Sequence, residues 1–179
     1  LMSDPVVDHP VSLPRRTDVI TKTGYLLAES VYEFTHADCA IINAGLVVKG
    51  IEGPKVTEYD VHQMLPHPIN LVRIKITGRD LKQVILTAEE QAYMHEHAQG
   101  LGFRGDIFGG YILYNMGYIE SEARFFVQGK EIDDDHVYTL GTVDMYTFGR
   151  YFPLFKNLPT EYLMPEFLRD IFKKKLLEL

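Results

Sequence analysis

The stretch Asn70-Leu-Val-Arg-Ile-Lys-Ile-Thr-Gly-Arg-Asp-Leu81 decides the fold class, because its hydrophobic period changes in the middle. Apolar and polar residues alternate up to Ile76, which predicts a half-buried strand. Thr77-Gly78 interrupts this pattern, and apolar residues then recur at helical spacing from about Arg79. A strand followed directly by an amphipathic helix predicts a domain in which helices pack on a sheet.

Similar patterns lie on the N-terminal side of this stretch. Apolar residues at Ile20, Leu27, Val31 and Phe34 predict a helix that begins near Thr17, with Thr17 and Asp18 at its first turn. Glycine is unfavourable inside a helix, so Gly24 predicts close packing against another backbone. The other elements predicted here are a buried strand at Cys39–Asn43 and a short helix opened by Thr57 that ends before Pro66.

On the C-terminal side the predicted elements are mostly strands. They cover residues 111–115, 118–127 and 136–143, with turns at 128–130 and 133–135, and a final helix over 161–175. Because the strands cluster late in the chain, we expect an α+β fold, a single domain of mixed sheet packed with helices. Residues 1–16 are rich in proline and are expected to be a linker from an N-terminal domain, which leaves 17–179 as the domain itself.

Composition excludes several classes of function. The chain has 179 residues and a net charge of −7, the wrong sign for a protein that must neutralise nucleic-acid phosphates. The basic run Lys173-Lys-Lys175 fits the last turns of a helix. No run of 18 apolar residues exists, so no membrane span is predicted. Cys39 is the only cysteine and lies in an apolar run, where a buried structural role is favoured.

Three motifs could carry chemistry, but their contexts do not support it. The string from Gly100 to Gly105 matches G-x-G-x-x-G, yet it follows a helix instead of a strand. His95 and His97 could bind a metal, but no third ligand lies nearby. Asp133-Asp-Asp135 lacks the other residues of a calcium loop and is expected to be a turn. The residues alone therefore predict an α+β domain without an identifiable catalytic set.

Three groups of segments, in order, resemble the C-terminal domain of the 5′-nucleotidase family. The segments that carry the resemblance are Thr23-Gly-Tyr-Leu-Leu-Ala-Glu-Ser30, Ala37-Asp-Cys-Ala-Ile-Ile-Asn-Ala-Gly45, Val56-Thr-Glu-Tyr-Asp-Val61, Gln63-Met-Leu-Pro-His67, Leu71 to Leu81, Gly129-Lys-Glu-Ile-Asp133, Tyr138-Thr-Leu140 and Val143-Asp-Met-Tyr-Thr-Phe-Gly149. Together they span roughly residues 17–156. No single segment is decisive, but their order and spacing are fairly specific.

This resemblance implies a division of labour between two domains. Enzymes of the family hydrolyse nucleotide phosphate esters with two divalent metal ions, which clamp the attacking and leaving oxygens. The ligand motifs for those metals belong to the family's N-terminal domain and are absent from this chain. The resemblance therefore implies that this chain binds the nucleoside part of a substrate, has no metal site and is inactive alone. The expected partners are the substrate and that N-terminal domain, not a nucleic-acid polymer or a membrane.

The resemblance also implies a set of substrate-binding residues. Asn43 and Gly45 match the family's loop after the first strand, and Lys49 lies beside Val48, where the family has an arginine. His67 stands where the family has its first stacking phenylalanine. The remaining expected residues are Met145 at the second stacking position, Tyr146 and Phe148 close to it, and Arg16 near an upstream family arginine.

The replaced arginine and phenylalanines leave three alternatives open. The substrate can be a nucleotide, it can be another phosphoester, or the domain can be a non-catalytic interaction module. If a base is clamped, Tyr146, Phe148 or Phe108 could replace the lost aromatic rings, since base–aromatic stacking contributes about 1–3 kcal/mol for each ring.

Overall fold

The structure is a computed structural model that describes residues 1–15, 21–90 and 109–179. Its helices are α1 (Lys22–Thr35), α2 (Glu58–Met64), α3 (Gly78–Glu90) and α4 (Leu168–Leu176), with 3-10 turns η1 (Ala44–Leu46), η2 (Glu120–Glu122), η3 (Asp144–Phe148) and η4 (Pro153–Asn157). The strands are β1 (Pro5–Val7), β2 (Val11–Leu13), β3 (Cys39–Asn43), β4 (Ile51–Gly53), β5 (Val56–Thr57), β6 (Asn70–Thr77), β7 (Tyr111–Tyr114), β8 (Met116–Ile119), β9 (Arg124–Val127), β10 (Lys130–Glu131), β11 (Val137–Val143) and β12 (Thr160–Phe167).

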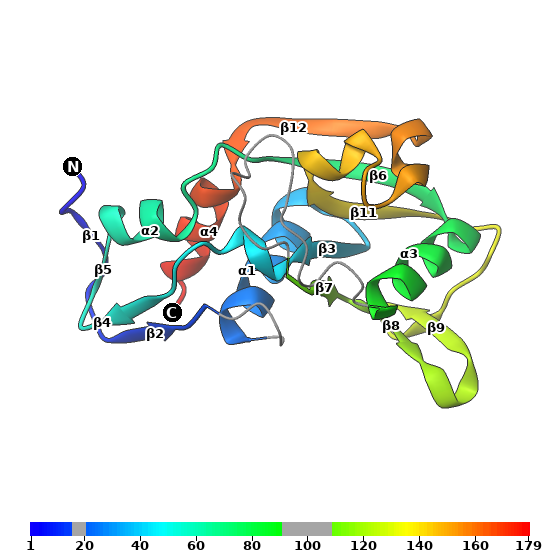
Figure 1. The fold of residues 1–179 in the computed structure, drawn as a ribbon, viewed down its shortest axis with the longest axis horizontal. Helices are drawn as coiled ribbons and strands as arrows, with labels where there is room; N and C mark the ends of the chain where they lie inside the picture. The colour runs from blue at the N-terminus through cyan, green and yellow to red at the C-terminus, as the bar shows by residue number, and fades with distance from the viewer. Residues whose placement is uncertain (16–20, 91–108) are drawn as a thin grey trace.

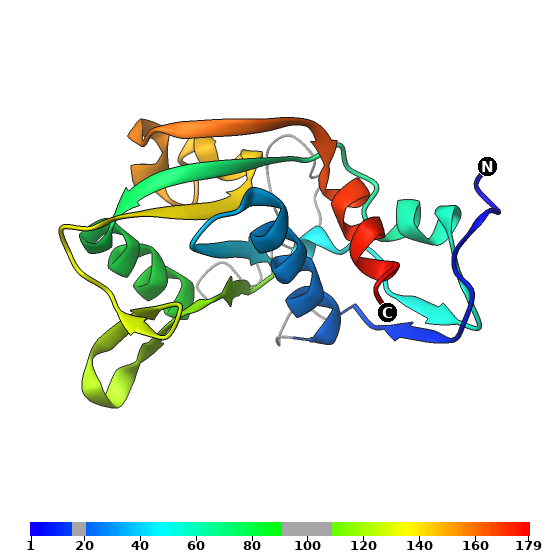
Figure 2. The ribbon, with the colours of Figure 1, turned by 180° about the vertical axis from the view of Figure 1, so that it is seen from behind.

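A five-stranded sheet in the order β12-β6-β11-β3-β7 forms the centre of the molecule. Only β11 and β3 are parallel neighbours, and the other pairs are antiparallel. Helices α1 and α4 lie on one face of this sheet, and α3, η3 and η4 lie on the other (Figures 1 and 2). The expected α+β class with a mixed sheet is confirmed.

The decisive stretch folds as the sequence predicts. In β6 the side chains of Val72, Ile74 and Ile76 are buried, while Arg73 and Lys75 are not. Helix α3 begins at Gly78, where a Cβ atom would lie 1.9 Å from the carbonyl oxygen of Asp133. The strand-to-helix junction thus needs glycine for close approach of two backbone segments.

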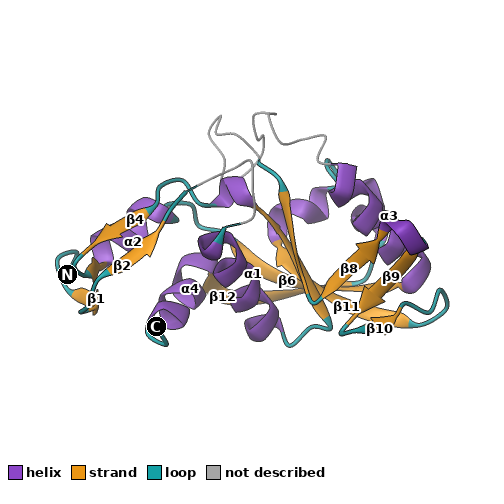
Figure 3. Cartoon of the chain, turned by 90° about the horizontal axis from the view of Figure 1, so that it is seen from below, coloured by secondary structure: helices purple, strands orange, loops and turns teal. Residues whose placement is uncertain are grey.

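Residues 5–13, expected to be a linker, contribute two short strands. β1 pairs with β5 and β2 pairs with β4, beside α2 (Figure 3). Leu13 is fully buried and belongs to the same hydrophobic core as the rest of the chain. The extended conformation predicted from the prolines is present, and it is packed against the body of the fold.

Helix α1 begins later than the sequence predicts. Thr21 caps it, with its hydroxyl oxygen accepting a hydrogen bond from the Gly24 amide at 3.2 Å. Thr17 and Asp18 lie outside the described residues. Gly24 packs closely as expected, but against a side chain: a Cβ atom there would lie 2.4 Å from Cδ1 of Ile112 in β7. The prediction of a backbone neighbour is therefore wrong.

Two further predictions of secondary structure are corrected. The strand predicted over 118–127 is a hairpin, because η2 reverses the chain between β8 and β9. The helix predicted from Glu161 begins only at Leu168, and residues 160–167 form β12 along β6. In the part of the chain that the structure describes, no helix is long and apolar enough to cross a membrane.

Candidate functional site

Of the expected substrate-binding residues that the structure describes, most lie in segments that follow or precede strands at one edge of the sheet. Since β3 and β11 are parallel, their carboxyl ends meet at this edge, and the antiparallel strands β6 and β7 begin there. Asn43 is the last residue of β3, and η3 follows β11 directly. This arrangement brings together the loops after β3 and β11 and the segment before β6.

Asn43 and Tyr146 form a direct pair at this edge. The Tyr146 hydroxyl donates a hydrogen bond to Asn43 Oδ1 at 2.6 Å, and both side chains are 0% exposed. The Tyr146 ring packs edge-on to Tyr111 at 6.2 Å and lies 5.8 Å from Phe152. Burial raises the pKa of Tyr146 well above its usual value, so the hydroxyl stays protonated and donates.

The loop after β3 runs from η1 toward α2. Gly45 is buried within η1, and the preceding Ala44 amide donates to Gly110 O at 2.9 Å. The Val48 amide donates to Met64 O at 2.8 Å, which ties the loop to the end of α2. Lys49 follows as an exposed side chain, so its ammonium group is accessible to an anionic ligand.

His67 lies in the segment between α2 and β6 and is half-buried. Its neighbours are held against α4: Arg169 Nη1 donates to Leu65 O at 3.0 Å, and the Leu168 amide donates to Ile69 O at 2.7 Å. The backbone on both sides of His67 is therefore held by contacts with the start of α4.

The residues of η3 differ sharply in exposure. Met145 is 3% exposed and belongs to the hydrophobic core, whereas Phe148 is 59% exposed. Thr147 anchors the turn, since its hydroxyl donates to Asp144 O at 2.7 Å and accepts from the Tyr162 hydroxyl at 3.1 Å. Among the described aromatic residues of η3, the ring that offers a free face is Phe148.

Asp144 is a polar residue at this edge that the sequence analysis missed. Burial raises the pKa of its carboxyl, and hydrogen bonds from the backbone near Asn70 and Met145 partly oppose that shift. The available signal was its place directly after a buried strand and one residue before Met145. It adds a half-buried acid between the end of β11 and the start of β6.

Several residues that the sequence suggested for ligand or metal binding lie outside the described part of the chain. Arg16, Phe108, the pair His95 and His97 and the segment 100–105 lie outside the described residues. Among residues 1–15, 21–90 and 109–179, no group of three or more His, Cys, Asp or Glu side chains is arranged to hold a metal ion. Cys39 is fully buried, and burial raises the pKa of its thiol, as the structural role requires.

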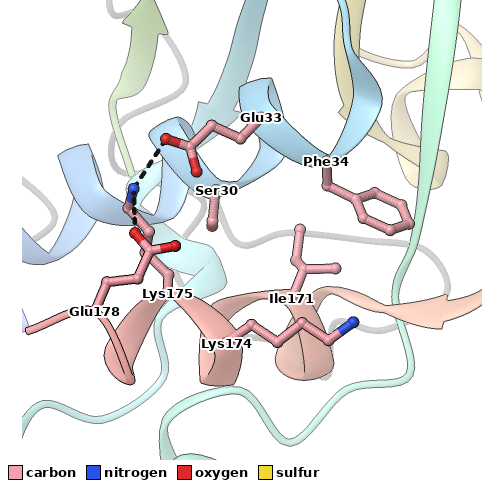
Figure 4. Close-up of a pocket in the computed structure, with 7 residues that line it drawn as sticks. All are labelled: Ser30, Glu33, Phe34, Ile171, Lys174, Lys175 and Glu178. Carbon is pink, nitrogen blue, oxygen red and sulfur yellow. Dashed lines mark hydrogen bonds and ion pairs between the residues drawn. The ribbon is translucent and has the colours of Figure 1, made fainter.

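A separate groove of about 220 Å³ lies between α1 and α4 (Figure 4). Within it Lys175 forms ion pairs with Glu33 at 3.0 Å and Glu178 at 3.2 Å, and a third with Glu29 at 2.7 Å. The residues that line it are Ser30, Glu33, Phe34, Ile171, Lys174, Lys175 and Glu178. These contacts hold the two helices together.

Comparison with known proteins supports the resemblance. The family model for the 5′-nucleotidase C-terminal domain matches residues 7–156. The uncharacterized metallophosphoesterase YunD of Bacillus subtilis (strain 168) is 34% identical over 161 residues, which are 84% of this chain and 35% of that protein. The chain thus spans about a third of the length of this relative.

Two solved structures show the same fold at low identity. The 5′-nucleotidase precursor from Thermus thermophilus superposes with a TM-score of 0.68 at 16% identity, covering 99% of this chain and 37% of that one. The NAD nucleotidase of Haemophilus influenzae gives a TM-score of 0.63 at 19% identity, covering 99% and 35%. With a family model that matches most of its residues, this chain belongs to the 5′-nucleotidase C-terminal domain family.

Proposed function

We propose that this chain is the substrate-recognition domain of a two-domain, metal-dependent 5′-nucleotidase or related phosphoesterase. In this proposal it binds the nucleoside part of a nucleotide, and an N-terminal domain hydrolyses the phosphate ester. The observation that carries the proposal is the meeting of three segments at one sheet edge, namely the loop after β3, the segment before β6 and η3. A rigid sheet edge that presents several loops is a common place for ligand binding.

Each exposed or half-buried side chain at this edge has a proposed role in binding the ligand. Phe148 offers an exposed ring on which a planar base can stack. The imidazole of His67 can stack from the neighbouring segment or form a hydrogen bond. Lys49 supplies a positive charge for the anionic part of the ligand. The Asn43–Tyr146 bond is buried, and in this proposal it supports the loops after β3 and β11.

The metal chemistry belongs outside this chain in the proposal. Two divalent ions in the N-terminal domain would supply the nucleophile and stabilise the charge of phosphoryl transfer. The residues described here hold and orient the leaving nucleoside, which is a contribution to positioning. Accordingly, the 179-residue chain is expected to bind nucleotides weakly and to hydrolyse none.

Nuclear magnetic resonance titration tests the binding role. Adenosine monophosphate, uridine monophosphate and glycerol phosphate are added separately to the ¹⁵N-labelled chain. We expect shifts at Gly45, Lys49, His67 and Phe148 with the nucleotides, and weaker binding by His67→Ala. His136→Ala is the matched control, because His136 is exposed and precedes β11 at the opposite edge. Shifts with glycerol phosphate as strong as those with nucleotides would identify another phosphoester.

Hydrolysis is tested by restoring an upstream domain. A chain extended to include the metal-ligand motifs should release phosphate from nucleotides when Mn²⁺ or Zn²⁺ is present, and the 179-residue chain should not. Metal-dependent hydrolysis by the 179-residue chain alone would overturn the division of labour.

The second candidate is a non-catalytic interaction module. The burial of Met145 favours it, because a side chain that is 3% exposed offers a base no stacking face. Val48 also stands where the family has an arginine, so this chain lacks a guanidinium group that could donate two parallel hydrogen bonds to the ligand. A titration with no shifts at millimolar nucleotide would support this candidate over the first.

A further inference from the structure

The contact between Asn43 and Tyr146 joins two parts of the chain that are far apart in sequence. Asn43 ends β3 and Tyr146 lies in η3, 103 residues later. Their hydrogen bond is 2.6 Å long and wholly buried. A buried acceptor that loses its donor is costly, so this bond strongly favours one arrangement of the two segments.

The Tyr146 hydroxyl is the donor of this bond, and Asn43 Oδ1 is the acceptor. The Tyr146 ring packs among Tyr111, Tyr151 and Phe152, with centroid distances of 6.2, 6.4 and 5.8 Å. Burial there raises the pKa of Tyr146 well above its usual value, so the hydroxyl keeps the proton that it donates to Asn43.

Two other hydrogen bonds lie near the ends of β3 and β11. The Thr142 hydroxyl donates to Ile41 O at 2.6 Å within the β3–β11 pair, and the Ala44 amide donates to Gly110 O at 2.9 Å at the start of η1. Asn43 is the last residue of β3 and pairs with Tyr111, whereas Tyr146 lies beyond the last residue of β11. The bond thus ties η3 to the end of β3, from which η1 follows directly.

We propose that Tyr146 is a positioning residue, whose hydroxyl fixes the Asn43 amide and so holds η1 and η3 as one unit at the substrate-binding edge. This inference rests on the proposed function for its effect on ligand binding, and on the bond itself for its effect on the loops. Tyr146 is then not a stacking residue, and the exposed groups of the two loops contact the ligand.

The test compares Tyr146→Phe with Tyr162→Phe. Tyr146→Phe keeps the ring and removes only the hydroxyl that reaches Asn43. Tyr162→Phe removes a hydroxyl that bonds to the same turn, at Thr147, and makes no bond to Asn43. We expect Tyr146→Phe to move the Asn43 side-chain amide resonance and to speed amide hydrogen exchange at 44–46 and 144–148 about tenfold. The control should change neither the Asn43 resonance nor exchange in η1.

Ligand affinity provides the second measurement, well below the unfolding temperature of each variant. Adenosine monophosphate should bind Tyr146→Phe about tenfold more weakly than the original chain. In the Asn43→Ala background, Tyr146→Phe should cause a smaller loss than in the original chain, because the bond between the two residues is already absent. A purely structural role would lower the unfolding temperature and leave the affinity unchanged, and that result would overturn the proposal.

The outcomes separate this inference from the proposed function. If the original chain binds no nucleotide but Tyr146→Phe frees both loops, the proposed function fails and the positioning of the loops stands. If nucleotides bind and the Asn43 resonance and loop exchange are unchanged in Tyr146→Phe, the positioning role fails and the proposed function stands.

Discussion

A Cβ atom at Gly141 would lie 2.2 Å from the hydroxyl oxygen of Thr35. Helix α1 therefore crosses the centre of β11 at its last turn, where Thr35 is fully buried and its hydroxyl donates to Val31 O at 2.8 Å. Arg73 of β6 donates to the Thr35 carbonyl oxygen at the same point. The end of α1 is thus fixed to the two strands next to the site.

Gly141→Ala should destabilise the fold, because the new methyl group has no space. Overpacking of this kind costs about 1–3 kcal/mol, which urea unfolding followed by circular dichroism would measure. Gly117→Ala is the control, since nothing lies within 4 Å of the position of its Cβ atom. Equal effects of the two substitutions would contradict the contact. Adding Thr35→Ala to Gly141→Ala should recover part of the loss.

Lys175→Met should loosen the packing of α4 on α1. The side chain is 9% exposed and pairs with Glu29, Glu33 and Glu178, which would be left without their cation. Hydrogen bonds to charged groups contribute about 1.5–3 kcal/mol, so a loss near the middle of that range is expected in thermal unfolding. Lys174→Met, on the exposed side of the helix, should change the unfolding free energy little.

The Lys175 contribution should not vary with pH near neutrality. Its hydrogen bonds to the three carboxylates outweigh the effect of burial and raise the pKa of the ammonium group above its ordinary 10.5. A raised pKa gives stability that is fully present below the ordinary value and is lost only as the pH rises through the raised one. The difference in unfolding free energy between Lys175→Met and the original chain should therefore be constant from about pH 6 to pH 9.

The contribution of Asp144 should vary with pH below neutrality, unlike that of Lys175. Burial raises the pKa of this carboxyl above its ordinary 3.8, so its stabilising contribution is present below that value and is lost as the pH rises. Asp144→Asn keeps a side-chain acceptor but removes the buried charge. Relative to this variant, the original chain should lose unfolding free energy as the pH is raised from 3.5 toward neutrality. An advantage of the original chain that grows with pH would contradict this assignment.

Cys39 should resist thiol reagents in the folded chain. Its side chain is fully buried, and burial raises the pKa of the thiol, so little thiolate exists at neutral pH. Reaction with dithiobisnitrobenzoate should be slow in buffer and complete within minutes in 6 M guanidinium. Rapid modification without denaturant would show that the strand opens easily.

Phe148→Ala should weaken binding of a nucleoside monophosphate by roughly 5- to 150-fold, because loss of base stacking costs about 1–3 kcal/mol. Isothermal titration calorimetry of the chain would measure this change. Tyr59→Ala provides the comparison, since Tyr59 is similarly exposed, at 52% against 59%, but lies on α2. An unchanged affinity in Phe148→Ala would remove this ring from the site.

The sequence predicts the helices and strands that are specified by neighbouring residues in the chain. The alternation in β6 and the capping threonine of α2 specify their elements without help from the rest of the chain. β12 is different, since residues 161–175 have apolar positions at helical spacing, yet pairing with β6 holds 160–167 extended. Pro165 was a local signal against a helix interior, and the periodicity outweighed it in the prediction. The hairpin after β8 was missed because its turn contains no glycine and ends at Ala123 with a positive φ of 50°.

Only part of the candidate site could be predicted. The family segments predict Asn43, His67 and Tyr146 as site residues, and in the structure the parallel pairing of β3 with β11 brings the loops after these strands to one edge. Burial could not be read from the same segments, so the resemblance puts Met145 at the stacking position although it lies in the core, and puts the exposed Phe148 only close to it. Asp144 has no motif of its own, and its environment depends on the neighbouring start of β6.

The parallel pair β3–β11 also has a kinetic consequence. Cys39 lies opposite Leu140, so this pairing closes a loop of about a hundred residues. Contacts of such long sequence separation form slowly, because most chain entropy must be lost before they are gained. During refolding, the hairpin of β8 and β9 can assemble early, whereas the edge that brings Asn43 to Tyr146 must wait for the two halves of the chain to meet.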